Sequence, residues 1–87
     1  MNYGIKIVDE EKNDVFAIGI IILQILGFKV MKLNYDVKLL EETLMDVECR
    51  YGKKMKIFLS RMLHHDQNKR INLNELVLLI RVNLWNY

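Results

Sequence analysis

Hydrophobic residues recur along this chain at helical spacing, and the first such segment, residues 15–26, is apolar at almost every position. A helix with apolar side chains on every side must be enclosed by neighbours. We expect it to begin at Asn13 or Asp14, whose side chains can accept hydrogen bonds from the N–H groups of a first turn. We expect it to stop at Gly27, because glycine readily adopts the left-handed conformation that ends many helices.

A second predicted helix follows Asp36, which can cap its first turn. Its apolar positions are three or four residues apart and are Val37, Leu40, Leu44, Val47 and Tyr51. The other side is charged, with Lys38, Glu41, Glu42, Asp46 and Glu48. This pattern predicts one buried face and one face in water, and Gly52 is expected to end the helix.

A third predicted helix opens at Lys53 and Lys54 and ends near His64 and His65. Its inward positions form one stripe, made of Met55, Phe58, Leu59, Met62 and Leu63. The spacing indicates a helix that packs on one side only.

The last predicted helix follows a loop over residues 66–71. Asn72 and Glu75 are three residues apart and form a capping-box-like start. The expected inward positions are Leu73, Leu76, Val77, Ile80 and Leu84, and Trp85 and Tyr87 close the chain.

Four helices with no convincing strand, repeat or low-complexity segment predict an all-α fold. We expect residues 1–12 to be a leader that is frayed or extended, and residues 13–87 to form one subdomain. A chain of 87 residues holds one small core at most, and 52% hydrophobic residues make it too apolar for a disordered segment.

Charge and cysteine usage exclude several classes of function. The net charge is +2 and the two signs alternate, so nothing draws the chain to nucleic acid or to a membrane surface. The longest apolar stretch has roughly fourteen residues, fewer than the ~20 that cross a bilayer. Cys49 is alone, so no internal disulfide forms, and no export signal is visible at the N-terminus. We therefore expect a cytoplasmic protein without membrane or nucleic-acid partners.

Two segments carry a resemblance to a known family. Residues 14–27 begin with Asp-Val-Phe-Ala-Ile-Gly, which resembles the D-V-W-S-x-G opening of the central helix in the large lobe of protein kinases. Residues 58–71 contain Met-Leu-His-His-Asp-Gln-Asn-Lys-Arg-Ile, which resembles the late M-L-x-x-D-P-x-x-R-I segment of the same lobe. The resemblance implies the four-helix rear half of that lobe, with the first helix at its centre.

In an intact relative the resemblance implies ATP-dependent phosphorylation of protein hydroxyls, with Mg²⁺. This sequence contains no Gly-rich loop, Val-Ala-Ile-Lys, His-Arg-Asp, Asp-Phe-Gly or Ala-Pro-Glu motif. We therefore expect a fragment of a kinase-like domain, comparable to a pseudokinase, with no catalytic residue, cofactor or metal site of its own.

The residues that match family positions are structural: Asp14, Phe16, Gly19, Asp66 and Arg70. The resemblance implies that Asp14 holds the backbone of a catalytic loop, although the same residue also suits a helix start. Phe16 replaces the family's tryptophan. Gly19 costs a helix roughly 1 kcal/mol relative to alanine, so we expect a neighbour to approach it closely.

Arg70 resembles the family arginine that pairs, buried, with the glutamate of Ala-Pro-Glu. Because that motif is missing, and an unpaired buried charge is costly, we expect Arg70 to be exposed or to take a carboxylate from another segment or chain. Gln67 stands where the family has proline, which loosens the loop that contains Asp66.

Two other interpretations compete with a kinase fragment. Three short helices cannot enclose so many apolar side chains, so exposed apolar area predicts a module that binds a protein partner or itself. A small DNA-binding domain is disfavoured, because Arg81 is the only basic residue of the last helix. His64, His65 and Asp66 suggest a metal site, but adjacent helical side chains diverge by about 100°.

Overall fold

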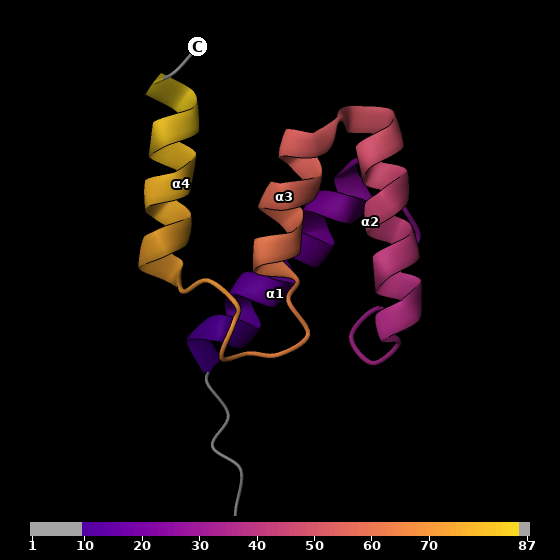
Figure 1. The fold of residues 1–87 in the computed structure, drawn as a ribbon. Coiled ribbons are helices and arrows are strands. Elements are labelled where there is room, and N and C mark those ends of the chain that lie inside the picture. The colour runs from indigo at the N-terminus through magenta and orange to yellow at the C-terminus, as the bar shows by residue number, and fades with distance from the viewer. Residues whose placement is uncertain (1–9, 86–87) are drawn as a thin grey trace, which may run out of the picture.

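The computed structural model describes residues 10–85, with side chains up to residue 82. It contains α1 (Glu10–Ile25), α2 (Val37–Tyr51), α3 (Lys53–Met62) and α4 (Leu73–Trp85), as Figure 1 shows. The described residues form no strand, which confirms the predicted all-α class with four helices. Residues 1–9, most of the predicted leader, lie outside the described residues.

The four helices share one hydrophobic core. α2 and α3 run in opposite directions on either side of Gly52, α1 crosses behind α3, and α4 stands on the side of α3 away from α2 (Figure 1). The buried apolar side chains are Val15, Leu23, Leu33, Leu40, Leu44, Val47, Leu59, Met62, Leu63 and Leu76. All four helices contribute to this core, and among residues 73–82 of α4 the contribution is Leu76 alone.

The start of α1 differs from the prediction. The helix begins at Glu10, so Asn13 and Asp14 lie inside it and are exposed. Glu10 and Glu11 occupy the first turn, where negative charge is favourable at the positive end of the helix dipole. The predicted start at Asn13 or Asp14 is therefore wrong.

The predicted end of α1 is confirmed. Gly27 has φ 93°, and its N–H donates to the carbonyl of Gln24 at 3.0 Å. The N–H of Phe28 donates to the carbonyl of Leu23 at 2.9 Å. This pair of bonds is a Schellman motif, and it satisfies carbonyls that the end of a helix would leave unpaired.

α1 is less enclosed than its composition predicts. Its fully buried residues, Val15, Gly19 and Leu23, are four apart and form a single stripe. On the opposite side Ile21 is 51% exposed and Ile25 is 76% exposed. The enclosing neighbours that the sequence predicted are missing from one side of this helix within residues 10–85.

The boundaries of α2 and its cap follow the prediction. The Asp36 carboxylate accepts a hydrogen bond from the Leu39 N–H at 3.0 Å, and Gly52 ends the helix with φ 95°. Leu40, Leu44 and Val47 are buried as expected. Val37 and Tyr51 are exposed, contrary to the prediction. Tyr51 instead uses its hydroxyl to bind the Leu26 carbonyl at 2.9 Å, which ties α2 to the end of α1.

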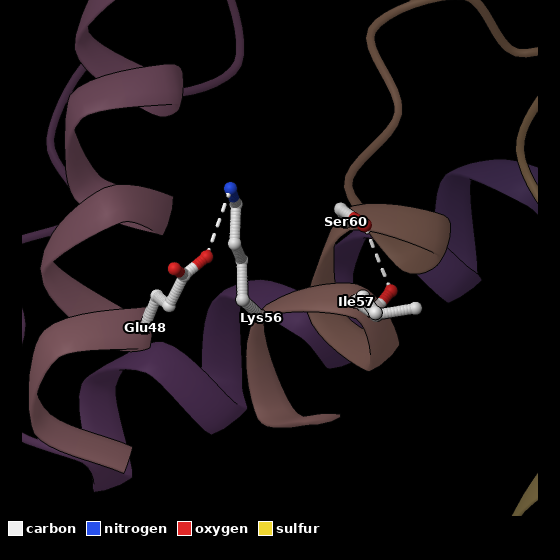
Figure 2. Close-up of polar contacts among 4 residues, drawn as sticks. All are labelled: Glu48, Lys56, Ile57 and Ser60. Atoms are coloured by element: carbon white, nitrogen blue, oxygen red, sulfur yellow. Dashed lines mark hydrogen bonds and ion pairs between the residues drawn. The ribbon is translucent and has the colours of Figure 1, made fainter. Parts of the chain in front are cut away.

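α3 also begins and ends as predicted, and its stripe faces the core. Leu59, Met62 and Leu63 are fully buried. Figure 2 shows an ion pair between α3 and α2, in which the Lys56 ammonium lies 3.1 Å from the Glu48 carboxylate. It also shows the Ser60 hydroxyl donating to the Ile57 carbonyl at 2.8 Å. An ion pair this exposed contributes about 1 kcal/mol at most.

The start of α4 is the predicted capping box. The Glu75 N–H donates to the Asn72 side chain at 2.8 Å, and the Asn72 N–H donates to the Glu75 carboxylate at 3.2 Å. The predicted inward face is confirmed only at Leu76. Three positions expected inside are instead exposed at 40–44% of their surface: Leu73, Val77 and Ile80. The side chain of Leu84 lies outside the described residues.

Candidate functional site

Arg70 is the centre of the most connected polar cluster in the described chain. It lies in the loop between α3 and α4, and only 8% of its surface is exposed. Its Nε donates to the His64 carbonyl and its Nη1 to the Lys12 carbonyl, both at 2.9 Å. The guanidinium carbon lies 4.8 Å from the centre of the Phe16 ring, within cation–π distance. Arg70 thus joins its own loop to the first two turns of α1.

The loop that holds Arg70 is shaped by Asp66. The Asp66 carboxylate accepts from the Asn68 N–H at 2.9 Å, and the Asp66 carbonyl accepts from the Lys69 N–H at 3.0 Å. The Asp66 N–H donates to His64 Nδ1 at 3.1 Å. These local bonds turn the chain so that Arg70 points back toward α1, without the proline that the kinase pattern has at Gln67.

A carboxylate of α1 joins the first turn of α1 to α4. Glu11 accepts a hydrogen bond from the Leu73 N–H at 2.9 Å, which satisfies one of the free N–H groups at the start of α4. Glu11 thus caps a helix whose first residue lies 62 positions further along the chain.

The partners of Arg70 differ from those expected. The residue is buried, and no carboxylate of residues 10–85 forms an ion pair with it. Two backbone carbonyls and an aromatic face take the place of the carboxylate. Burial lowers the pKa of Arg70, and the nearby Asp66 charge offsets this in part. The fold therefore holds a cation whose charge is only partly balanced by the described residues.

The other predicted site residues divide into two groups. Phe16 and Asp66 lie around Arg70, as described above, and Gly19 lies one turn further along α1. A Cβ built on Gly19 would be 2.7 Å from Leu63 Cδ2 and 3.3 Å from Met62 Cβ. The close approach of α3 therefore explains why position 19 is a glycine. The atoms that approach it belong to side chains of α3 and not to its backbone. Asp14 is exposed and takes no part in the cluster.

The substitution Gly19→Ala is expected to lower the free energy of unfolding by about 1 kcal/mol. Overpacking a filled core costs about 1–3 kcal/mol, and alanine returns about 1 kcal/mol of helix propensity. Leu63 is fully buried and has little room to shift. Urea denaturation of the single variants and of the double variant measures the coupling. In the Leu63→Ala background, Gly19→Ala should become neutral or stabilising; an equal loss in both backgrounds would contradict the packing argument.

The histidine pair does not form a metal site with other described residues. His64 and His65 are both exposed, and among residues 10–85 no group of three or more His, Cys, Asp or Glu side chains converges. His64 uses Nδ1 to accept the Asp66 N–H. Its role in the described structure is to shape the loop.

Two surface hollows flank the cluster. A depression of about 260 Å³ is lined by Asn13, Phe16, Ala17, Asn34 and Arg70. A groove of about 270 Å³ lies between α3 and α4 and is lined by Arg61, Ile71, Glu75, Leu78, Leu79 and Val82. Sequence reasoning missed both, because each hollow combines residues from distant segments; no local pattern marks Asn34 or Arg61.

Comparisons with known protein families, curated proteins and solved structures find no match. Among the described helices, none combines the length and apolarity needed to span a bilayer.

Proposed function

We propose that this chain is a non-catalytic helical module that binds a protein partner. The observation that carries the proposal is the groove between α3 and α4, where Leu78 is 59% exposed and Val82 is 53% exposed. Apolar side chains exposed along one groove are typical of interaction surfaces. Figure 1 shows α4 beside α3 with no further helix of residues 10–85 covering that side.

The chemistry of the groove specifies its occupant. The floor is apolar, while Arg61 and Glu75 supply opposite charges at its polar positions. An amphipathic helix fits such a groove, with an apolar stripe at three- and four-residue spacing and charged residues on both sides. The occupant we propose is therefore a helix of a partner protein.

The test begins with the oligomeric state and continues with a purified partner. Light scattering on the 87-residue protein determines whether the chain is a monomer or associates with a second copy. A protein captured from the source cells is then purified, and its dissociation constant is measured by calorimetry. Leu78→Asp should weaken binding at least tenfold, because it places a charge in the apolar groove.

Met45→Asp is the matched control. Met45 is 62% exposed and does not line the groove. It belongs to α2, the helix on the side of α3 away from α4 (Figure 1), so the same kind of charge is introduced elsewhere. Its binding should stay within twofold of the unsubstituted chain. Equal losses for both variants, or a monomer for which no saturable partner exists, would reject the proposal.

A second candidate specifies what that partner is. The two segments that resemble protein kinases meet in space: Phe16 from the first contacts Arg70 from the second, and Gly19 packs on Leu63. In this candidate the chain is the rear half of a kinase-like lobe, and the partner is a chain with the remainder of the domain. Asp14 is exposed, as it would be where its implied partner loop is missing.

This candidate is tested with the purified chain and with its partner. The chain alone should show no phosphate transfer from ATP to a protein substrate. A captured partner that carries Gly-rich, His-Arg-Asp and Asp-Phe-Gly segments would support the candidate. Phosphate transfer by the isolated chain, abolished by a substitution within it, would overturn the non-catalytic assignment.

A further inference from the structure

The depression beside Arg70 has the composition of a binding site for an anion. It is formed by the N-terminal half of α1, through Asn13, Phe16 and Ala17, by Asn34 before α2, and by Arg70. None of these residues lines the groove between α3 and α4. The depression is therefore separate from the proposed partner surface.

Hydrogen-bond donors remain available at this depression. A guanidinium has five N–H bonds, and Arg70 uses two of them for the His64 and Lys12 carbonyls. The Arg70 Nη2 makes no hydrogen bond within residues 10–85, and since no buried side-chain nitrogen there lacks a partner, Nη2 is not fully buried. It can therefore donate to solvent or to a ligand. Asn13 and Asn34 are both exposed, and each carries an amide NH₂ group.

The electrostatics favour an anion of low charge. The guanidinium forms no ion pair with the described residues, and its charge is balanced only in part by Asp66. A carboxylate can accept two parallel N–H bonds from one guanidinium. The Asp66 carboxylate acts electrostatically on the guanidinium, and its negative charge disfavours a doubly charged phosphate. Phe16 and Ala17 add apolar wall that suits the carbon chain of an organic acid.

We propose that this depression binds a carboxylate group, held by Arg70 and by the amides of Asn13 and Asn34. The carboxylate belongs either to a free organic acid or to an acidic side chain of a protein. Both sources present the same planar group, and the experiment separates them.

The experiment uses nitrogen-15 NMR on the full chain. The Arg70 Nε–H and the Asn13 and Asn34 side-chain amide signals are followed during titration with sodium acetate, against sodium chloride of equal ionic strength. A second titration uses a short peptide with one glutamate, against the same peptide with glutamine. Saturable shifts of these signals with acetate would show that a free organic acid binds at the depression. Shifts with the glutamate peptide and none with acetate would show that the carboxylate must belong to a protein. No saturable shift with either probe, or equal shifts with chloride, would overturn the proposal.

Two variants test the position of the site without altering buried Arg70. Asn34→Asp places a negative charge at the rim and should weaken carboxylate binding about tenfold. Gln24→Glu makes the same change of an exposed amide to a carboxylate, about 12 Å along α1 from Phe16. It should bind within twofold of the unsubstituted chain. Equal affinities for the two variants would also overturn the proposal.

Discussion

Arg70→Met is expected to lower the free energy of unfolding by about 3 kcal/mol. The guanidinium makes hydrogen bonds to the Lys12 and His64 carbonyls and stacks over Phe16. A hydrogen bond to a charged group contributes about 1.5–3 kcal/mol, and methionine replaces only the apolar part of the side chain. Methionine carries no charge, so the variant no longer has the desolvation cost of a buried cation, and this offsets part of the lost stability. The variant should therefore release the α3–α4 loop from α1.

Urea denaturation with an unchanged m-value would measure this effect. Arg70→Lys should recover only part of the loss, because an ammonium cannot reach two carbonyls in the fixed geometry of a guanidinium. Arg81→Met is the control, since Arg81 is exposed on α4 and its replacement should change stability by about 0.5 kcal/mol or less. If Arg70→Met and Arg81→Met were equally stable, the cluster would have no role in holding the fold.

Leu59→Ala is the second large expected effect, with a loss of about 2–5 kcal/mol. Leu59 is fully buried in α3, where that helix packs on both α2 and α1. The stability of a chain of 87 residues is about 4–13 kcal/mol at 0.05–0.15 kcal/mol per residue. Leu59→Ala therefore removes a large share of the total stability. The midpoint of denaturation should move to a much lower temperature or urea concentration.

Ile57→Ala is the matched control for the core substitution. Ile57 lies two residues away on the same helix but is 42% exposed, so we expect a loss of about 1 kcal/mol or less. A similar loss for Leu59 and Ile57 would mean that α3 does not present the described face to the core.

Local signals in the sequence predicted the helix ends well. Asp36, Gly52 and the Asn72–Glu75 pair each act within four residues of the helix end that they stabilise. The start of α1 was missed because Asn13 and Asp14 are good caps in isolation. The helix in fact includes the preceding turn, where Glu11 accepts a hydrogen bond from the Leu73 N–H. Because Leu73 is distant in the chain, no local pattern indicates this contact.

The candidate site was predicted in part. The kinase-like pattern selected Phe16, Gly19, Asp66 and Arg70, and the structure brings Phe16 and Asp66 close to Arg70. It did not predict the partners of Arg70, since backbone carbonyls carry no sequence signal. The depression with Asn13 and Asn34, and the groove with Arg61 and Glu75, join segments whose spacing along the chain is uninformative.

Helix caps and helical periodicity depend on neighbours a few positions away, so the sequence alone predicts that this protein is helical and where most of its helices end. Which apolar residues are buried depends on the packing of the helices. Leu23 and Ile25 are equally suited to a core, yet one is fully buried and the other is 76% exposed. The difference arises because α3 and α4 cover one side of α1 and no described helix covers the other, and this depends on packing between segments far apart in the chain.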